Sequence, residues 1–252
     1  MDRIRPHLRG AHPETADWAN TVFCAAFPYY AGKDEDANLS LYARGIDYHH
    51  VLGAALEEIC GLLRARFPEF RFERYADSGL LPEVETARLC GAAMTGRHGL
   101  AIVPPYGSFV FLGFLLTDWA GPMEDADAGH CENCGACEAA CPTGALCGGS
   151  VDPMRCLSAI TQKKGVLSDW EREQLRAAPL IWGCDACQLA CPYNASPRET
   201  SISAFRDKIV RLEISDLEGL SNRQLEQTYP HRAFTWRGAE VLRRNLRIKE
   251  NS

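Results

Sequence analysis

The most regular hydrophobic pattern in the chain lies between residues 48 and 67, where apolar side chains recur every three or four positions. This spacing lines them along one side of an α-helix, so the segment is predicted to be an amphipathic helix packed on a core. The apolar positions are Val51, Leu52, Ala55, Leu56, Ile59, Leu62 and Leu63.

Shorter apolar segments flank this helix and are typical of strands. The segment from Trp18 to Tyr30 is rich in β-branched and aromatic residues, and Arg71 to Tyr75 is a second candidate that ends at the turn-forming triplet Asp77-Ser78-Gly79. A second helix is predicted from Glu83 to Cys90.

The longest apolar stretch, Leu100 to Leu116, predicts two buried strands around a turn, because prolines and glycine interrupt it at positions 104, 105 and 107. The alternation of strands and helices up to residue 122 indicates a layered α/β unit. Residues 123–197 change character and contain most of the cysteines. Residues 198–252 become helical and then basic, with six Lys/Arg and one acid between Arg232 and Lys249. The sequence leaves two interpretations of this basic end open, namely contact with phosphate or a solvated helix face.

Composition narrows the class of protein. The 252 residues are 46% hydrophobic with a net charge of −6, which excludes a chain disordered throughout and a generally basic nucleic-acid binder. The N-terminus has no apolar signal segment, and the Leu100–Leu116 stretch is too interrupted to span a membrane, so we expect a cytoplasmic protein without a membrane partner. In a reducing compartment, 12 cysteines indicate metal binding or catalysis before disulfides.

Eight of the cysteines form two ordered motifs. The first is C-x2-C-x2-C-x3-C-P from residue 131 to 142, the pattern of bacterial ferredoxins with two [4Fe–4S] clusters. The second has one cysteine at 156 and then C-x2-C-x3-C-P from 184 to 192. Since the last cysteine of such a motif serves the other cluster, we expect cluster one on Cys131, Cys134, Cys137 and Cys191, and cluster two on Cys156, Cys184, Cys187 and Cys141.

Structural zinc and disulfides are the alternatives. Zinc sites use pairs of cysteines or cysteine with histidine, which explains neither the third cysteine of the first motif nor the two Cys-Pro endings. Of the remaining cysteines, Cys24, Cys60 and Cys90 are expected to be small buried core residues, and Cys147 is not expected to be a ligand.

The segments HCENCGACEAACPTGAL, RCLSAITQKKG and WGCDACQLACPYN resemble the epoxyqueuosine reductase family. So do YARGIDYH (42–49), GSFVFLGFLLTD (107–118) and the turn at Asp77-Ser78. The resemblance implies an α+β fold, with a nitroreductase-like α/β cobalamin-binding domain over residues 1–122. This domain is followed by a two-cluster ferredoxin-like module over 123–197 and by a short helical basic segment over 198–252. The family's C-terminal helical-repeat domain, which grips tRNA, is expected to be missing, so the chain is interpreted as a short form.

The resemblance also implies a reaction. The family passes electrons through two [4Fe–4S] clusters to base-off cobalamin, which reduces epoxyqueuosine in tRNA to queuosine. Asp77 matches the position of the family's proton donor. The alternative for Asp77 is a turn residue that caps the Ser78-Gly79 backbone. Other positions that the resemblance places near the cofactor are Arg44, Asp47, Tyr48, His98, Ser108, Ser158, Lys164 and Asp185. His49 is not assigned as a cobalt ligand.

Two departures from the family pattern stand beside these matches. After the aspartate the family has D-S-x-P-x-x-E-R, whereas this chain has Leu80 in place of the proline and Val84 in place of the arginine. Where the family has Gly-Lys, this chain has Gly96-Arg97, so an arginine replaces the lysine. The expected partners are an external low-potential electron donor and, less firmly because of the missing repeat domain, tRNA; the chain is expected to be a monomer. Two other functions stay open, a corrinoid reductase with another substrate and an electron-transfer protein without cobalamin.

Overall fold

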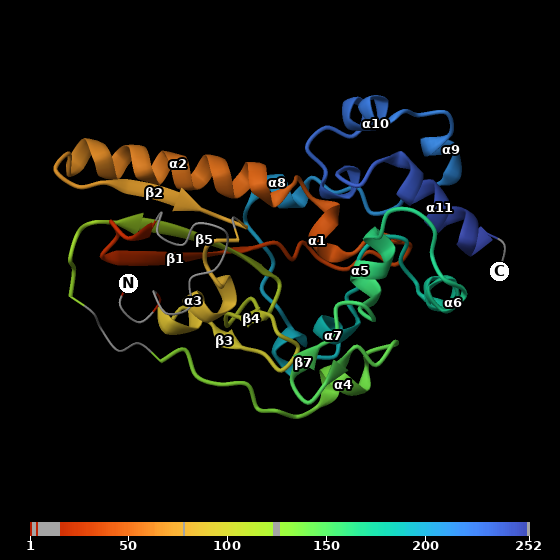
Figure 1. Ribbon diagram of the computed structural model, residues 1–252, viewed down its shortest axis with the longest axis horizontal. Helices are drawn as coiled ribbons and strands as arrows, with labels where there is room; N and C mark the ends of the chain where they lie inside the picture. Colours follow the sequence, from red (N-terminus) through yellow and green to blue (C-terminus); the bar gives the residue numbers. More distant parts are fainter. Residues whose placement is uncertain (2–3, 5–15, 78, 123–126, 251–252) are drawn as a thin grey trace.

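A computed structural model describes residues 1, 4, 16–77, 79–122 and 127–250. Its first part is an antiparallel sheet in the order β1-β5-β2 (Figure 1), built from β1 (Thr21–Pro28), β5 (Val110–Thr117) and β2 (Phe72–Tyr75). In register, Thr21 and Phe72 flank Thr117 on either side of the central strand β5. The strands predicted from the sequence are therefore confirmed, and the Leu100–Leu116 stretch divides as expected into β4 (Ala101–Ile102) and β5.

Both faces of the central strand are covered. Leu115 faces the helix α2 (Tyr48–Arg66), where it shares a core with Leu52 and Leu56. Leu112, Phe114 and Leu116 alternate with it and join a second core that contains α3 (Glu83–Leu89) and β4; β3 (Met94–Thr95) pairs with β4. Since side chains on a strand alternate between faces, a strand that is buried on both faces reads as a continuous apolar run.

The cysteine-containing segment consists of short elements joined by turns. In chain order they are α4 (Ala136–Ala139), β6 (Leu146–Cys147), β7 (Ser150–Val151), α5 (Leu157–Gln162), α6 (Asp169–Ala177), α7 (Ala186–Leu189) and the 3-10 helix η3 (Pro192–Asn194). The two one-turn helices α4 and α7 lie within the two cysteine motifs, with Cys137 on α4 and Cys187 on α7, and they contact each other. The motifs are thus brought together from positions about 50 residues apart in the chain.

The last part of the chain packs onto the first and second parts. Its elements are α8 (Ser203–Arg206), α9 (Ile214–Leu217), α10 (Asn222–Thr228), η4 (Ala233–Thr235) and α11 (Ala239–Glu250). In Figure 1 these blue elements lie beside α1 (Leu41–Arg44) and α5. One hydrophobic core unites Leu242 and Phe234 with Leu39 and with the fully buried Trp182.

The basic side chains of α11 hold this part in place. Arg243 donates hydrogen bonds to the carbonyls of Leu217 and Leu220. Arg244 donates to the carbonyls of residues 163 and 165, and Lys249 donates to that of Ala178. These three cations therefore donate hydrogen bonds to backbone carbonyls. This role differs from both phosphate contact and a solvated helix face, the two interpretations that the sequence left open.

The four cysteines outside the motifs are free thiols. Cys60 is fully buried, and Cys24 and Cys90 are partly buried in the core beneath the sheet. Burial raises the pKa of Cys24 to about 12, so this thiol stays protonated and behaves as an apolar side chain. Cys147 is exposed on the β6–β7 hairpin. In the part of the chain described here, no helix is both long and apolar enough to cross a bilayer.

Candidate active site

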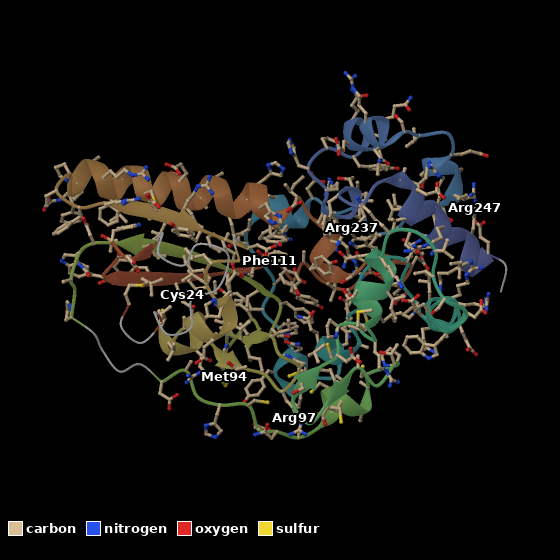
Figure 2. All side chains as sticks on the ribbon, in the orientation of Figure 1. Cys24, Met94, Arg97, Phe111, Arg237 and Arg247 are labelled. Atoms are coloured by element: carbon tan, nitrogen blue, oxygen red, sulfur yellow. The ribbon has the colours of Figure 1, made fainter. Side chains whose placement is uncertain are left out.

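A cavity of about 550 Å³ lies where the sheet-containing part meets the cysteine-containing segment. Its lining comes from residues 29–48, 77–112 and 141–188 and is mostly apolar and aromatic. Phe111, near the centre of the molecule in Figure 2, is one of the lining side chains and stacks on Tyr48 with 4.4 Å between ring centroids. A cavity of this volume and character is in the range of those that bind organic cofactors and substrates.

The eight motif cysteines form two groups in space. One group lines the large cavity and consists of Cys141, Cys156, Cys184 and Cys187. The other group lines a separate small pocket and consists of Cys131, Cys134, Cys137 and Cys191. In each group the last cysteine of one motif lies with members of the other motif, which is the crossed arrangement of two-cluster ferredoxins.

The four cysteines of each group line a pocket rather than converge on one point. Within the described residues, no three His, Cys, Asp or Glu side chains converge closely enough to hold one ion. In a [4Fe–4S] cluster each thiolate binds a different iron, so the four sulfur atoms surround a larger space. Although burial raises the pKa of Cys141, backbone N–H groups of Leu146, Thr143 and Ala145 contribute hydrogen bonds that leave it lowered. Such donors favour a thiolate.

Asp77 lies at the edge of the large cavity, on the loop after β2. Its backbone is left-handed, with φ of 46°, a conformation that aspartate adopts more easily than most residues. Tyr48 donates a hydrogen bond of 2.5 Å from its hydroxyl to Asp77 Oδ2, and His49 Nε2 lies 3.3 Å from the same oxygen. The Asp77 backbone N–H donates to Glu83 Oε1 at 2.5 Å. The carboxyl is thus held at the cavity while its side chain remains 58% exposed.

Comparison with known proteins identifies the relatives of this arrangement. Residues 130–194 match the family of 4Fe–4S double cluster binding domains, and residues 9–78 match the family described as epoxyqueuosine reductase QueG, DUF1730. The epoxyqueuosine reductase of Listeria monocytogenes is 32% identical over 98% of this chain and 66% of its own length. That of Lactococcus garvieae is 31% identical over 97% of this chain and 71% of its own length. The chain belongs to the epoxyqueuosine reductase family.

Solved structures of the epoxyqueuosine reductase family agree with this assignment. The Streptococcus thermophilus enzyme superimposes with a TM-score of 0.84 at 29% identity, over 97% of this chain and 67% of that one. An epoxyqueuosine reductase with a tRNA-Tyr epoxyqueuosine-modified stem loop gives a TM-score of 0.83 at 25% identity, over 96% and 67% of the two chains. The chain spans between about half and three quarters of the length of the relatives it matches.

Five of the nine noncysteine positions predicted for the site line the large cavity. They are Asp77, Tyr48, His98, Ser108 and Ser158. His98 is buried, which lowers the pKa of its imidazole, and its Nδ1 accepts a hydrogen bond from the Leu100 backbone. His98 also lines the small cysteine pocket, so it lies between the two sites.

The other four predicted positions lie outside the cavity lining. Asp47 caps the start of α2 by accepting from the His49 backbone N–H, and Lys164 lines a different groove beside α5. Asp185 is buried, which raises its pKa, and it accepts hydrogen bonds from Ser40 Oγ and the Leu41 backbone. The Asp47 and Asp185 carboxylates thus accept hydrogen bonds from neighbouring protein groups in this structure.

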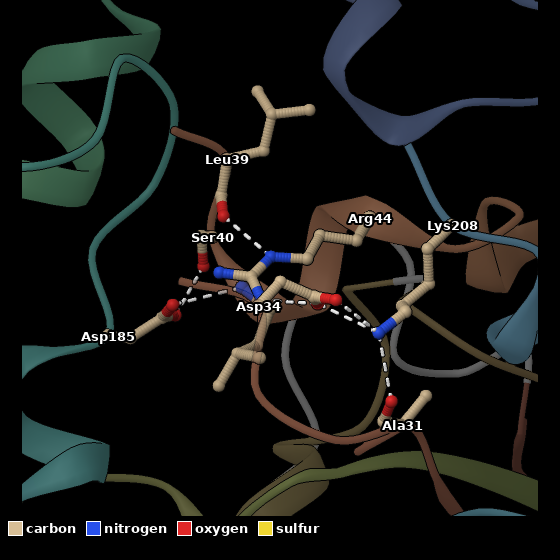
Figure 3. Close-up of polar contacts among 8 residues, drawn as sticks. Ala31, Asp34, Leu39, Ser40, Arg44, Asp185 and Lys208 are labelled. Atoms are coloured by element: carbon tan, nitrogen blue, oxygen red, sulfur yellow. Dashed lines mark hydrogen bonds and ion pairs between the residues drawn. The ribbon is translucent and has the colours of Figure 1, made fainter. Parts of the chain in front are cut away.

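Arg44 takes part in a buried ion-pair network outside the cavity lining (Figure 3). Its guanidinium is buried, donates to the Leu39 carbonyl and forms an ion pair of 3.1 Å with Asp34. Lys208 binds the same Asp34 carboxylate at 2.8 Å. The resemblance placed Arg44 near the cofactor, whereas in the structure it joins α1 to the loop before it and to the C-terminal part.

This ion-pair network gives a prediction about stability. Asp34→Ala removes the carboxylate from a buried Arg44, and we expect a loss of about 3 kcal/mol in the free energy of unfolding, because an unpaired buried charge is costly. Chemical denaturation of the wild-type and variant proteins measures this difference in the free energy of unfolding. Glu57→Ala is the matched control, since Glu57 also binds two cations, Arg64 and Arg74, but at an exposed site where ion pairs contribute little. Equal effects of the two substitutions would contradict the prediction.

Sequence reasoning missed five polar residues of the cavity lining, which are Tyr29, Tyr42, Glu83, Thr143 and Gln188. Gln188 donates from Nε2 to the carbonyl and hydroxyl of Ser108 and to the Tyr29 hydroxyl, so the three groups form one buried network. Burial raises the pKa of Glu83 above its ordinary value. Glu83 lies six residues after Asp77, at the start of a predicted helix. This position could have indicated from the sequence that Glu83 contacts the loop that carries Asp77.

Proposed function

We propose that this protein reduces epoxyqueuosine to queuosine, with electrons that pass through two [4Fe–4S] clusters to a bound cobalamin. The observation that carries the proposal is a single cavity with four motif cysteines on one wall and Asp77 at its edge. Electrons and a proton can therefore reach one bound molecule from two sides. Family membership supports the same reaction, because the relatives are epoxyqueuosine reductases.

The cavity residues fit a corrin. Aromatic and aliphatic side chains form most of the lining, and the polar side chains at its edge offer hydrogen bonds to the amide groups that surround a corrin ring. His98 is the one histidine among the described lining residues, and because its Nδ1 accepts from the Leu100 backbone, the neutral imidazole carries its proton on Nε2 rather than a free lone pair. A cobalamin without a protein ligand on cobalt is consistent with that arrangement.

Removal of the epoxide oxygen as water consumes two electrons and two protons. A cobalamin held among the cavity residues would supply a reducible metal centre for this chemistry. Asp77 is proposed to donate a proton to the departing oxygen, for which its position at the cavity edge and its hydrogen bond from Tyr48 are suitable. A cluster held by Cys141, Cys156, Cys184 and Cys187 on the cavity wall would be the immediate electron source, and one held by the other cysteine group would take electrons from an external low-potential donor.

The proposed substrate is the modified nucleoside within tRNA. Its support is the structural relative that carries a tRNA-Tyr epoxyqueuosine-modified stem loop and aligns with 96% of this chain. We further propose the domain organisation that the sequence predicts, with residues 1–122 for cofactor and substrate, 123–197 for the clusters and 198–252 as a short helical basic segment. The free thiols are in keeping with a cytoplasmic location.

Anaerobic reconstitution with iron, sulfide and cobalamin tests this proposal. We expect about eight irons per chain, a base-off corrin spectrum and conversion of epoxyqueuosine in tRNA to queuosine with a strong chemical reductant. Iron uptake without corrin uptake would overturn the enzyme proposal and favour an electron carrier. Corrin uptake without activity on tRNA, but with activity on the free nucleoside, would overturn tRNA as the substrate.

A further inference from the structure

We propose that His49 passes protons from solvent to Asp77 and that Asp47 orients His49 for this transfer. The inference rests on the proposed function, in which Asp77 protonates the departing oxygen. It concerns a part of the site that faces away from the cavity, because Tyr48 and Asp77 line the cavity and His49 does not.

The imidazole of His49 lies between two carboxylates. Its Nδ1 is 2.8 Å from Asp47 Oδ1, and its Nε2 is 3.3 Å from Asp77 Oδ2. Because an ionised carboxylate only accepts hydrogen bonds, the Asp47 contact assigns a proton to Nδ1. Nε2 can then donate to an ionised Asp77 or accept from a protonated one, so the same contact persists on both sides of a proton transfer.

Neighbouring groups fix the orientation of this imidazole. Asp47 also accepts from the His49 backbone N–H at 2.9 Å, so the helix cap and the imidazole contact come from one carboxylate. The Tyr48 ring stacks on His49 with 4.1 Å between centroids and on Phe111 on its other side. Rotation of the imidazole away from Asp77 would break both contacts.

The asymmetry of this pair lies in the cavity: the Asp77 side chain, although 58% exposed, lines the cavity and would be covered by a bound molecule, whereas His49 lies outside the lining. The His49 side chain is 51% exposed, so its imidazole can exchange protons with solvent. Asp77 contacts His49 and also lines the cavity. A proton can therefore enter at His49 and leave at Asp77 without passing through the cysteine pockets.

The stoichiometry of the reaction requires a second proton, which such a path can deliver. Release of the epoxide oxygen as water takes two protons, and the Asp77 carboxyl carries one. In the transfer proposed here, the Nε2–H bond of His49 breaks and an O–H bond forms on Asp77. A solvent acid then reprotonates His49. No electron moves in this step, since the reducing electrons come from the external donor through the clusters.

Two substitutions separate proton transfer from simple positioning. His49→Gln keeps a polar side chain beside Asp77 but cannot carry a proton, and we expect kcat to fall at least about tenfold with KM unchanged. His49→Ala should lose as much, and added imidazole should restore most of its kcat because the site is open to solvent. The matched control is His50→Gln, the adjacent histidine, whose Nε2 contacts His231 at 3.1 Å. It should keep normal kcat.

Asp77→Asn, assayed in parallel on reconstituted enzyme, distinguishes this inference from the proposed function. Normal turnover by Asp77→Asn would remove the proposed role of Asp77. An inactive Asp77→Asn together with normal turnover by His49→Gln would overturn the inference alone. Failure of imidazole to restore His49→Ala, with iron and corrin content equal to wild type, would also overturn it.

Discussion

Asp77→Asn is expected to lower turnover of epoxyqueuosine by about 10²- to 10⁴-fold, the contribution typical of a general acid. The asparagine side chain has almost the same shape and can still accept the Tyr48 hydroxyl at its oxygen. Its amide cannot release a proton to the departing oxygen. The substitution therefore removes the chemistry and leaves the cavity intact. Single-turnover conversion of modified tRNA, with cobalamin reduced beforehand, measures the effect.

Iron content and the corrin spectrum should not change in this variant, because Asp77 belongs to neither cysteine group. Asp118→Asn is a suitable control. Asp118 accepts a hydrogen bond from the Arg71 backbone and follows the last residue of β5, whereas the first residues of β5 line the cavity. Loss of the Asp118 carboxylate should therefore leave turnover unchanged. Full activity of Asp77→Asn would show that the proton comes from another group.

The contacts that hold Asp77 at the cavity can be set beside one structure of a relative. It is a Bacillus subtilis epoxyqueuosine reductase whose catalytic aspartate loop is swung out of the active site, and it superimposes with a TM-score of 0.84. In this chain Asp77 has a left-handed backbone, and its side chain is more than half exposed. Contacts with Tyr48, His49 and Glu83 are what hold it at the cavity. Those contacts are therefore the place where substitutions should change the position of the loop.

The elements of the fold and the grouping of the cysteines could be predicted from sequence because both depend on local spacing. A helix with apolar positions every three or four residues has one way to pack, and α2 begins and ends within a residue of the predicted range. Two cysteine motifs with fixed gaps likewise determine which thiols wrap which cluster. The crossed grouping of Cys141 and Cys191 follows from that geometry.

The polar contacts of the site could not be predicted in this way, because they depend on residues that are distant in the sequence. Whether Arg44 faces a cofactor depends on Asp34 and on Lys208, which lies 174 residues away from Asp34. Asp185 is satisfied by Ser40, 145 residues earlier. A family motif can mark such residues as important, but it does not separate a ligand contact from a buried hydrogen bond that supports the fold.

Cys187→Ala is expected to halve the iron content, from about eight to about four per chain, and to abolish turnover. Cys187 lies on the cavity wall with Cys141, Cys156 and Cys184, so its loss removes a ligand of cluster two. Without that cluster, electrons that arrive at cluster one have no relay to the cavity. Iron analysis and low-temperature EPR of the reduced protein measure the first effect, and single-turnover assays measure the second.

Two further cysteine variants make this prediction specific. Cys134→Ala should also halve the iron content, but the cluster that remains is the one beside the cavity, so a strong chemical reductant should still drive turnover. Cys147→Ala should keep all the iron and full activity, because Cys147 is an exposed thiol on the β6–β7 hairpin outside both groups. If Cys134→Ala and Cys187→Ala lost turnover equally with the chemical reductant present, the assignment of cluster two as the immediate electron source would be wrong. The different outcomes expected for these two ligands follow from the position of one cysteine group on the cavity wall and the other in its own pocket.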